Sequence, residues 1–181
     1  GQDCARRFFS LPRGTKREQL RSRDNPWGYY DRELTKERRD RKEIFDIGPD
    51  AGGVVAAGGD PFAGTTPWPE EPQDFASTMQ AWFGRMTRLS DQLAGLISAS
   101  LTGDFDALRS AFQPAHTSFL RLNFYPVADP LGGEATDHAD LGVHHHTDAG
   151  ALTVLLQDEI AGLQVHHGGA WHNVEPITGA F

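Results

Sequence analysis

The sequence predicts an α+β protein with a β-barrel or jelly-roll (double-stranded β-helix) core and supporting helices on its N-terminal side. Two observations carry this prediction. An amphipathic helix is indicated after residue 74, and only short runs with strand-like alternation follow residue 118. Helices first and antiparallel strands afterwards are typical of α+β proteins, and several short strands divided by turn residues favour a barrel or jelly roll.

Residues 1–48 are polar and are interpreted as helical, with a charged stretch after Pro12. In this region Ile44, Phe45 and Ile47 are the expected inward-facing residues. Residues 48–72 are dense in Gly and Pro and hold too few apolar residues to build a core, so a loop is predicted there.

A clear helix is predicted next, with Asp74 as its N-cap. Its apolar residues recur at steps of three and four, which places them on one face. They are Met79, Trp82, Phe83, Met86, Leu89, Leu93, Leu96 and Ile97. Such a stripe indicates packing, here as the support helix of a neighbouring sheet. The run "DFDALRSAF" predicts a second, shorter helix that ends at Pro114.

The run "SFLRLNFYP", from residue 118, alternates as a strand does. Leu120, Leu122 and Phe124 share one face, and the opposite face carries Arg121, Asn123 and Tyr125. Further strands are predicted in "LGVHHHTD", "ALTVLLQD", "GLQVHH" and "AWHNVEP", and "HHGGAWHN" indicates a hairpin turn.

Bulk properties exclude several classes of function. The 181 residues predict one domain, and a net charge of −8 argues against nucleic acid as the main partner. No apolar run approaches the roughly 20 residues of a membrane helix. Cys4 is the only cysteine, which excludes an internal disulfide and a Cys-based zinc site. A cytoplasmic protein without membrane or nucleic-acid partners is therefore expected.

The run "HHHTD" raises the question of a metal site. On a strand, residues two apart point to the same side, so His146 and Asp148 can converge on one ion while His145 points away. One imidazole nitrogen and one carboxylate oxygen are two of the three ligands of a facial triad for non-haem Fe(II). The alternative is an exposed histidine tract that binds metals adventitiously.

The segment "HTDAGALTVLLQDEIAGLQVHHGGAWHNVEPITGAF" resembles the core of the Fe(II)- and 2-oxoglutarate-dependent dioxygenases of the isopenicillin N synthase type. The matching elements are H-T-D, a small-residue turn, L-T-x-L-x-Q-D, G-L-Q-V, a Trp-containing strand and P-x-x-G-A-F. Upstream, "LRLNFYP" is similar to the family's R-x-N-Y-Y-P strand. The resemblance is strong over residues 118–181 and looser before them.

The resemblance implies a role for individual residues. His146 and Asp148 correspond to the iron ligands, and Asn123 and Tyr125 to side chains that help hold 2-oxoglutarate; an ordinary buried tyrosine is the alternative for Tyr125. His144 and His145 have no ligand role in that pattern. The later histidines of the chain are not expected to ligate either; they are His166, His167 and His172. No catalytic residue beyond these is assigned.

The resemblance also implies a division into a helical region over residues 1–114 and a partial dioxygenase core over residues 115–181. The family's second iron histidine and its co-substrate arginine match nothing up to Phe181, so a fold truncated at both ends is expected, with little or no turnover by this chain alone. The implied reaction uses dioxygen to hydroxylate, desaturate or cyclise a small organic metabolite. Two alternatives stay open: an oxidase that uses no 2-oxoglutarate, and an inactive remnant that serves as a binding module.

Overall fold

The computed structural model describes residues 1–49, 64–110, 117–129, 131–132 and 141–181. The contacts divide the chain into two compact units, each described here by itself. The first comprises Gly1 and Asp3–Thr147, and the second comprises Gln2 and Asp148–Phe181. None of the described helices is long and apolar enough to cross a membrane.

The N-terminal region begins with helices and continues with strands. The helical part comprises α1 (Gln2–Phe9), α2 (Arg13–Lys16) and the 3-10 turn η1 (Arg17–Gln19). It is followed by β1 (Gly28–Tyr30), β2 (Leu34–Thr35), β3 (Arg38–Arg39) and β4 (Glu43–Ile47). The prediction of helix up to residue 48 is therefore wrong from residue 28 onward.

Two physical reasons account for the strands. The β1 and β4 segments are rich in aromatic and β-branched residues that fit a pleated, buried surface. Lys36 and Glu37 both adopt positive φ, which makes the two-residue turn that joins β2 to β3. The alternating charges between residues 31 and 43 therefore belong to a short hairpin and its ion pairs instead of a solvated helix face.

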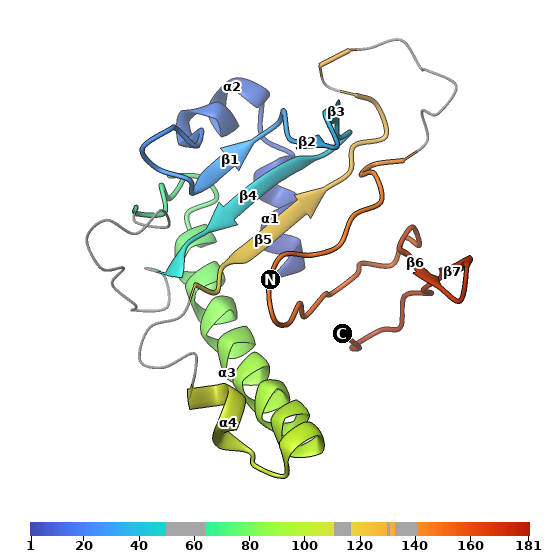
Figure 1. The fold of residues 1–181 in the computed structure, drawn as a ribbon. Helices are drawn as coiled ribbons and strands as arrows, with labels where there is room; N and C mark the ends of the chain where they lie inside the picture. Colours follow the sequence, from blue (N-terminus) through green and yellow to red (C-terminus); the bar gives the residue numbers. More distant parts are fainter. Residues whose placement is uncertain (50–63, 111–116, 130, 133–140) are drawn as a thin grey trace. The chain divides into compact units, whose positions relative to one another are not determined.

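The central sheet has the order β1-β4-β5, in which all neighbours are antiparallel (Figure 1). The strand predicted after residue 118 is confirmed as β5 (Leu120–Phe124). Its register places Phe45 opposite Leu122 and Asp46 opposite Arg121. Because β5 pairs with β4, the first strand of the resemblance segment shares a sheet with the N-terminal region.

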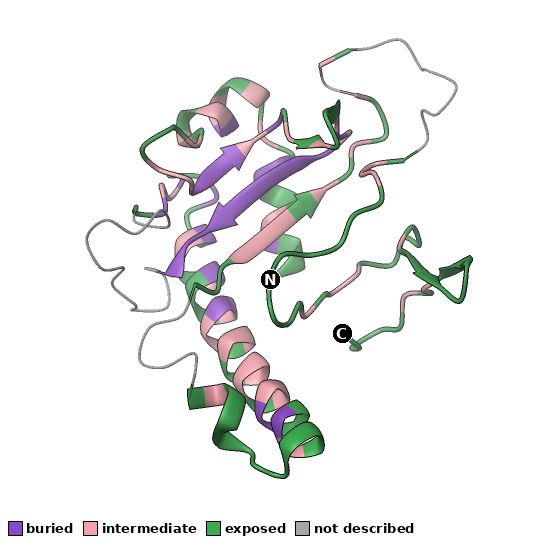
Figure 2. Cartoon of the chain, viewed as in Figure 1, coloured by how far each residue is buried: buried purple, intermediate pink, exposed green. Residues whose placement is uncertain are grey.

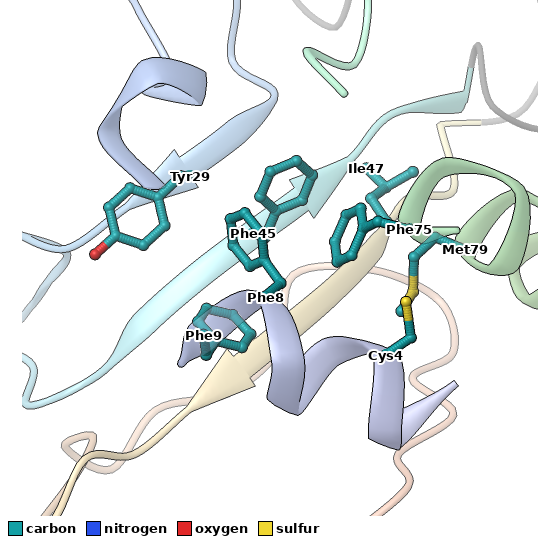
Figure 3. Packing of buried hydrophobic residues seen from close by; sticks show 8 residues of the cluster. All are labelled: Cys4, Phe8, Phe9, Tyr29, Phe45, Ile47, Phe75 and Met79. Atoms are coloured by element: carbon teal, nitrogen blue, oxygen red, sulfur yellow. The ribbon is translucent and has the colours of Figure 1, made fainter. Parts of the chain in front are cut away.

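One face of this sheet packs against α1 and the start of α3 (Phe75–Thr102). Figure 3 shows the buried cluster. It consists of Cys4, Phe8, Phe9, Tyr29, Phe45, Ile47, Phe75 and Met79. The predicted inward faces are confirmed: Ile44, Phe45 and Ile47 are buried, and the three apolar residues of β5 pack against the cluster.

Aromatic contacts give the core its geometry. The Phe8 ring centroid lies 5.0 Å from that of Phe45 and 4.9 Å from that of Phe75. Edge-on and tilted rings at this separation add about 0.5–1.5 kcal/mol per pair beyond the burial of their area. Figure 2 shows the result, with β1 and β4 mostly buried.

The predicted long helix is confirmed as α3, which ends at Gly103 in the left-handed conformation. Its predicted apolar stripe packs only in part. Met79 and Phe83 are buried, whereas Leu96 and Ile97 are exposed by 60% and 41%. Asp74 occupies the N-cap position, but its carboxylate accepts a hydrogen bond from Arg7 Nη2 at 2.6 Å and caps no helix N–H through its side chain.

The second predicted helix is confirmed as α4 (Asp106–Arg109). Arg109 donates from Nε and Nη2 to the Asp91 carboxylate at 2.9 and 2.6 Å, which fastens α4 to α3. Pro114, its expected end, lies outside the described residues, as does most of the predicted loop over residues 48–72.

The second unit contains the hairpin β6 (Gln164–His167) and β7 (Ala170–Asn173). Gly168 and Gly169, with φ of 60° and 82°, form its two-residue turn, as "HHGGAWHN" predicts. The strands predicted over residues 141–148 and 151–158 are absent from the described structure. A strand needs a hydrogen-bonded neighbour, and no described strand pairs with either run.

Candidate functional site

The face of the sheet opposite the core carries a charged network around β5. Arg121 donates from Nε to Asp46 Oδ1 and from Nη2 to Asp46 Oδ2, both at 2.7 Å, and from Nη1 to Glu33 Oε2 at 3.1 Å. Lys42 Nζ lies 2.9 Å from Glu33 Oε2, and Arg21 Nη1 lies 3.5 Å from Glu33 Oε1. Arg121 therefore pairs with carboxylates of its own chain, which holds β5 against β4.

The network shifts the pKa values of its acids in opposite directions. Burial raises the pKa of the Asp46 carboxyl, and the hydrogen bonds and charge of Arg121 only partly offset that rise. Burial also acts to raise the pKa of Glu33, but the Lys42 hydrogen bond and the charge of Arg121 outweigh it, so the net pKa is lowered. The neighbouring basic side chains therefore compensate the burial of the Glu33 carboxylate better than that of the Asp46 carboxylate.

Asn123 and Tyr125, the predicted co-substrate residues, follow Arg121 along β5. Asn123 is exposed and lies opposite Ile44 in the sheet register. The Tyr125 side chain is exposed by 50%. Burial of its hydroxyl, with a smaller contribution from the charge of Asp40, raises the pKa of Tyr125, so the phenol keeps its proton at neutral pH and can donate a hydrogen bond.

The Tyr125 ring lies directly against Gly142. A Cβ atom built on Gly142 would stand 2.4 Å from Tyr125 Cδ1 and 2.8 Å from Cε1. The Gly142 carbonyl also accepts a hydrogen bond of 2.9 Å from the backbone N–H of Arg41, just ahead of β4. The segment that leads into "HHHTD" is therefore attached to the sheet at the end of β5, a contact that the sequence analysis missed. The only signal for it was a glycine four residues ahead of His146.

His146 is exposed, and its Nδ1 lies 2.8 Å from the carbonyl oxygen of His144. When Nδ1 donates to that carbonyl, Nε2 carries the lone pair, which is the tautomer that a metal ligand requires. The donor chemistry of His146 therefore fits a divalent metal such as Fe(II).

Asp148 is exposed and belongs to the second unit. Neither His146 nor Asp148 lies on a strand, so the alternation that predicted their convergence does not apply. Within the described ranges, no group of three or more His, Cys, Asp or Glu side chains is arranged to hold a metal. Their pairing at one ion stays a prediction.

The later histidines lie on the β6–β7 hairpin. His172 Nε2 is 3.3 Å from the His167 carbonyl oxygen, and the His166 ring centroid is 5.1 Å from that of Trp171. Trp171 is exposed by 53%. In the described structure these contacts are local to the hairpin.

Comparison with known proteins decides the family. Residues 116–181, which contain Asn123, Tyr125, His146 and Asp148, match the 2OG-Fe(II) oxygenase superfamily. This segment of the chain belongs to that superfamily. The 2OG-Fe(II) oxygenase match thus includes every residue that the resemblance singled out.

Curated relatives align with the chain well beyond that segment. A probable iron/ascorbate oxidoreductase from Dictyostelium discoideum is 30% identical over 98% of this chain and 55% of its own length. Clavatol oxidase from Penicillium crustosum is 37% identical over 76% of this chain and 43% of its own length. The chain spans about half the length of such relatives.

Solved structures agree on the fold. JOX2, crystallised with 2OG, Fe and JA, matches 99% of this chain and 51% of its own chain with a TM-score of 0.77 and 24% identity. A full-length Neurospora crassa protein in complex with alpha-KG and 5-formyluracil matches 98% and 53% with a TM-score of 0.74 and 25% identity. The mixed helix and strand content of the prediction is confirmed.

Proposed function

We propose that the protein is a non-haem Fe(II)- and 2-oxoglutarate-dependent oxygenase that oxidises a small organic molecule with dioxygen. The observation that carries the proposal is the superfamily match over residues 116–181, because this one segment holds all four predicted ligand and co-substrate residues. The finer fold assignment, a jelly-roll core, and the cytoplasmic location are part of the same proposal.

In this proposal His146 and Asp148 hold the metal. His146 is suited to it because Nδ1 is engaged by the His144 carbonyl, which directs the ligating lone pair to Nε2. Asp148 contributes a carboxylate oxygen, the hard donor that Fe(II) accepts beside imidazole. The bound metal supplies the dioxygen chemistry, while the protein supplies ligand geometry and orientation.

Asn123 and Tyr125 bind the co-substrate. An amide and a phenol are hydrogen-bond donors suited to a carboxylate. The Tyr125 hydroxyl is protonated at neutral pH, as an ordinary tyrosine is, so it can donate a hydrogen bond to an anionic co-substrate. The sheet register and the Arg121–Asp46 pair hold both residues at the end of β5.

The test is 2-oxoglutarate turnover by the natural protein at full length, with Fe(II) and without it. We expect turnover that requires the metal and is abolished by His146→Ala and by Asp148→Ala, with folding unchanged. His167→Ala, on the exposed hairpin, is the matched control and should keep normal turnover. Near-normal turnover by either ligand variant rejects the assignment, and substrate oxidation without 2-oxoglutarate favours the oxidase alternative.

A further inference from the structure

Contacts of Gly142 with Tyr125 and Arg41 attach the start of the histidine segment, residues 142–146, to the central sheet. The Tyr125 ring covers one side of Gly142, and the backbone N–H of Arg41 donates to the Gly142 carbonyl at 2.9 Å. Tyr125 directly follows β5, and Arg41 precedes β4 by two residues. Both partners of Gly142 therefore flank the same end of two paired strands, where Glu43 lies opposite Phe124.

The contact leaves no room for a side chain at residue 142. A Cβ there would overlap the ring at 2.4 Å, well inside van der Waals contact. The ladder that joins β4 to β5 runs from Glu43–Phe124 to Ile47–Leu120 and fixes the backbone next to Tyr125, so the ring can avoid a Cβ only by rotating away from residue 142. Any residue other than glycine must push the segment away from the sheet or displace the ring.

The contact lies close to His146 along the chain. His146 lies four residues beyond Gly142, so the Cα atoms of the two residues can be at most about 14 Å apart even in a fully extended chain. Its ring is in turn oriented by the His144 carbonyl, two residues beyond Gly142. Backbone that is fixed at residue 142 therefore limits how far His144 and His146 can move from the sheet.

We infer that Gly142 is a positioning residue for the metal ligand His146, and that the Tyr125 ring and the Arg41 backbone N–H form the clamp that holds it. The inference rests on the proposed function. It gives Tyr125 two separable roles. The ring packs on Gly142 and holds the histidine segment, and the hydroxyl donates a hydrogen bond to the co-substrate.

The first experiment needs no metal. Amide hydrogen exchange is measured over residues 141–147 in the full-length natural protein, in Gly142→Ala and in Gly14→Ala. A Cβ on Gly14 meets nothing within 4 Å, so this control carries the same substitution without the overlap. We expect about tenfold faster exchange in Gly142→Ala only, since overpacking of this size commonly has that effect on local stability.

The second experiment titrates Mn(II), as a stand-in for Fe(II), into the same three proteins without co-substrate. Gly142→Ala is expected to bind about tenfold more weakly than the wild type and Gly14→Ala to bind equally. Both measurements are repeated in a Tyr125→Ala background. There Gly142→Ala should add no further change, because the ring that its Cβ would strike is gone.

The outcomes separate the inference from the proposed function. Unchanged amide exchange in Gly142→Ala would contradict the clamp. A full additional effect of Gly142→Ala in the Tyr125→Ala background would contradict it as well. Faster exchange with unaltered Mn(II) affinity overturns the positioning role. If the wild type binds no Mn(II), the positioning role and the proposed metal site both fail, while the exchange data still decide whether the clamp exists.

Discussion

Arg121 of β5 closes on Asp46 of β4 through two hydrogen bonds of 2.7 Å, one from Nε and one from Nη2. The two residues are directly opposite in the antiparallel register. This forked geometry is specific to a guanidinium and a carboxylate. It locks together the two strands at whose shared end Tyr125 and the Gly142 clamp lie.

Replacing Arg121 by Ala should therefore destabilise the fold. Asp46 is buried and would keep only the longer ion pair with Arg21 Nη1, at 3.8 Å, so losing the Arg121 fork should cost about 3 kcal/mol in the free energy of unfolding. Arg121→Lys should recover only part of the loss, because an ammonium cannot form the fork. Urea unfolding measures both. Arg38→Ala, at an exposed position of β3, is the control and should stay within about 0.5 kcal/mol of the wild type.

A second buried pair lies beside the core. Lys16 Nζ is 2.5 Å from Glu43 Oε2, which also accepts a hydrogen bond of 2.7 Å from the Tyr29 hydroxyl. Lys16→Met should lower the free energy of unfolding by about 3–5 kcal/mol, because Glu43 would be left charged and buried. Adding Glu43→Gln should restore part of that loss in thermal or urea unfolding. Equal losses in the single and double variants would contradict this account.

Two glycines of α3 should respond in opposite ways to the same substitution. A Cβ on Gly95 would stand 2.3 Å from Phe105 Cζ, whereas one on Gly84 would meet only Arg88 Nη1 at 3.7 Å. Gly84→Ala should raise the free energy of unfolding by about 0.5–1 kcal/mol through helix propensity. Gly95→Ala should lower it by about 1–3 kcal/mol through overpacking. Calorimetric melting checks both; a stabilised Gly95→Ala would show that α4 does not pack as described.

Glu33 should contribute to acid unfolding. Its pKa is lowered in the folded state, so its contribution is complete above the unfolded pKa of about 4.3 and is lost as pH falls through the folded value. Glu33→Gln should therefore flatten the loss of stability below about pH 4.3. Urea midpoints from pH 3 to 7 measure it.

Asp46 should affect the pH dependence of stability in the direction opposite to Glu33. Its raised pKa means that the folded state holds its proton longer than the unfolded state, so its contribution declines as pH rises from about 3.9 through the folded value. Asp46→Asn should remove that decline. A change of the same sign in both variants would contradict the assigned pKa shifts.

The hydroxyl of Tyr125 can be tested apart from its ring. Tyr125→Phe keeps the ring against Gly142, so Mn(II) affinity should be unchanged. If the hydroxyl donates to 2-oxoglutarate, its loss should raise the KM for 2-oxoglutarate by about tenfold, the usual worth of one such bond. Steady-state kinetics on the full-length natural protein checks this. A lost Mn(II) affinity with unchanged KM would reverse the two roles.

The sequence by itself determined the local features that rest on periodicity and turn chemistry. The steps of three and four after Asp74 predicted α3, alternation predicted β5 with its apolar face inward, and Gly168-Gly169 predicted the β6–β7 turn. The family followed from the resemblance of "HTD" and "LRLNFYP" to its motifs, and the superfamily match over residues 116–181 confirms it.

Only the tertiary structure decided what depends on partners distant in sequence. Residues 28–47 look helical from their charges, yet they form strands because β4 pairs with β1 and, across more than seventy residues, with β5. The same pairing sends Arg121 to Asp46 and sets the Tyr125 ring on Gly142. Local sequence carries no record of such contacts, since their energy comes from burial and pairing that exist only once the chain has folded.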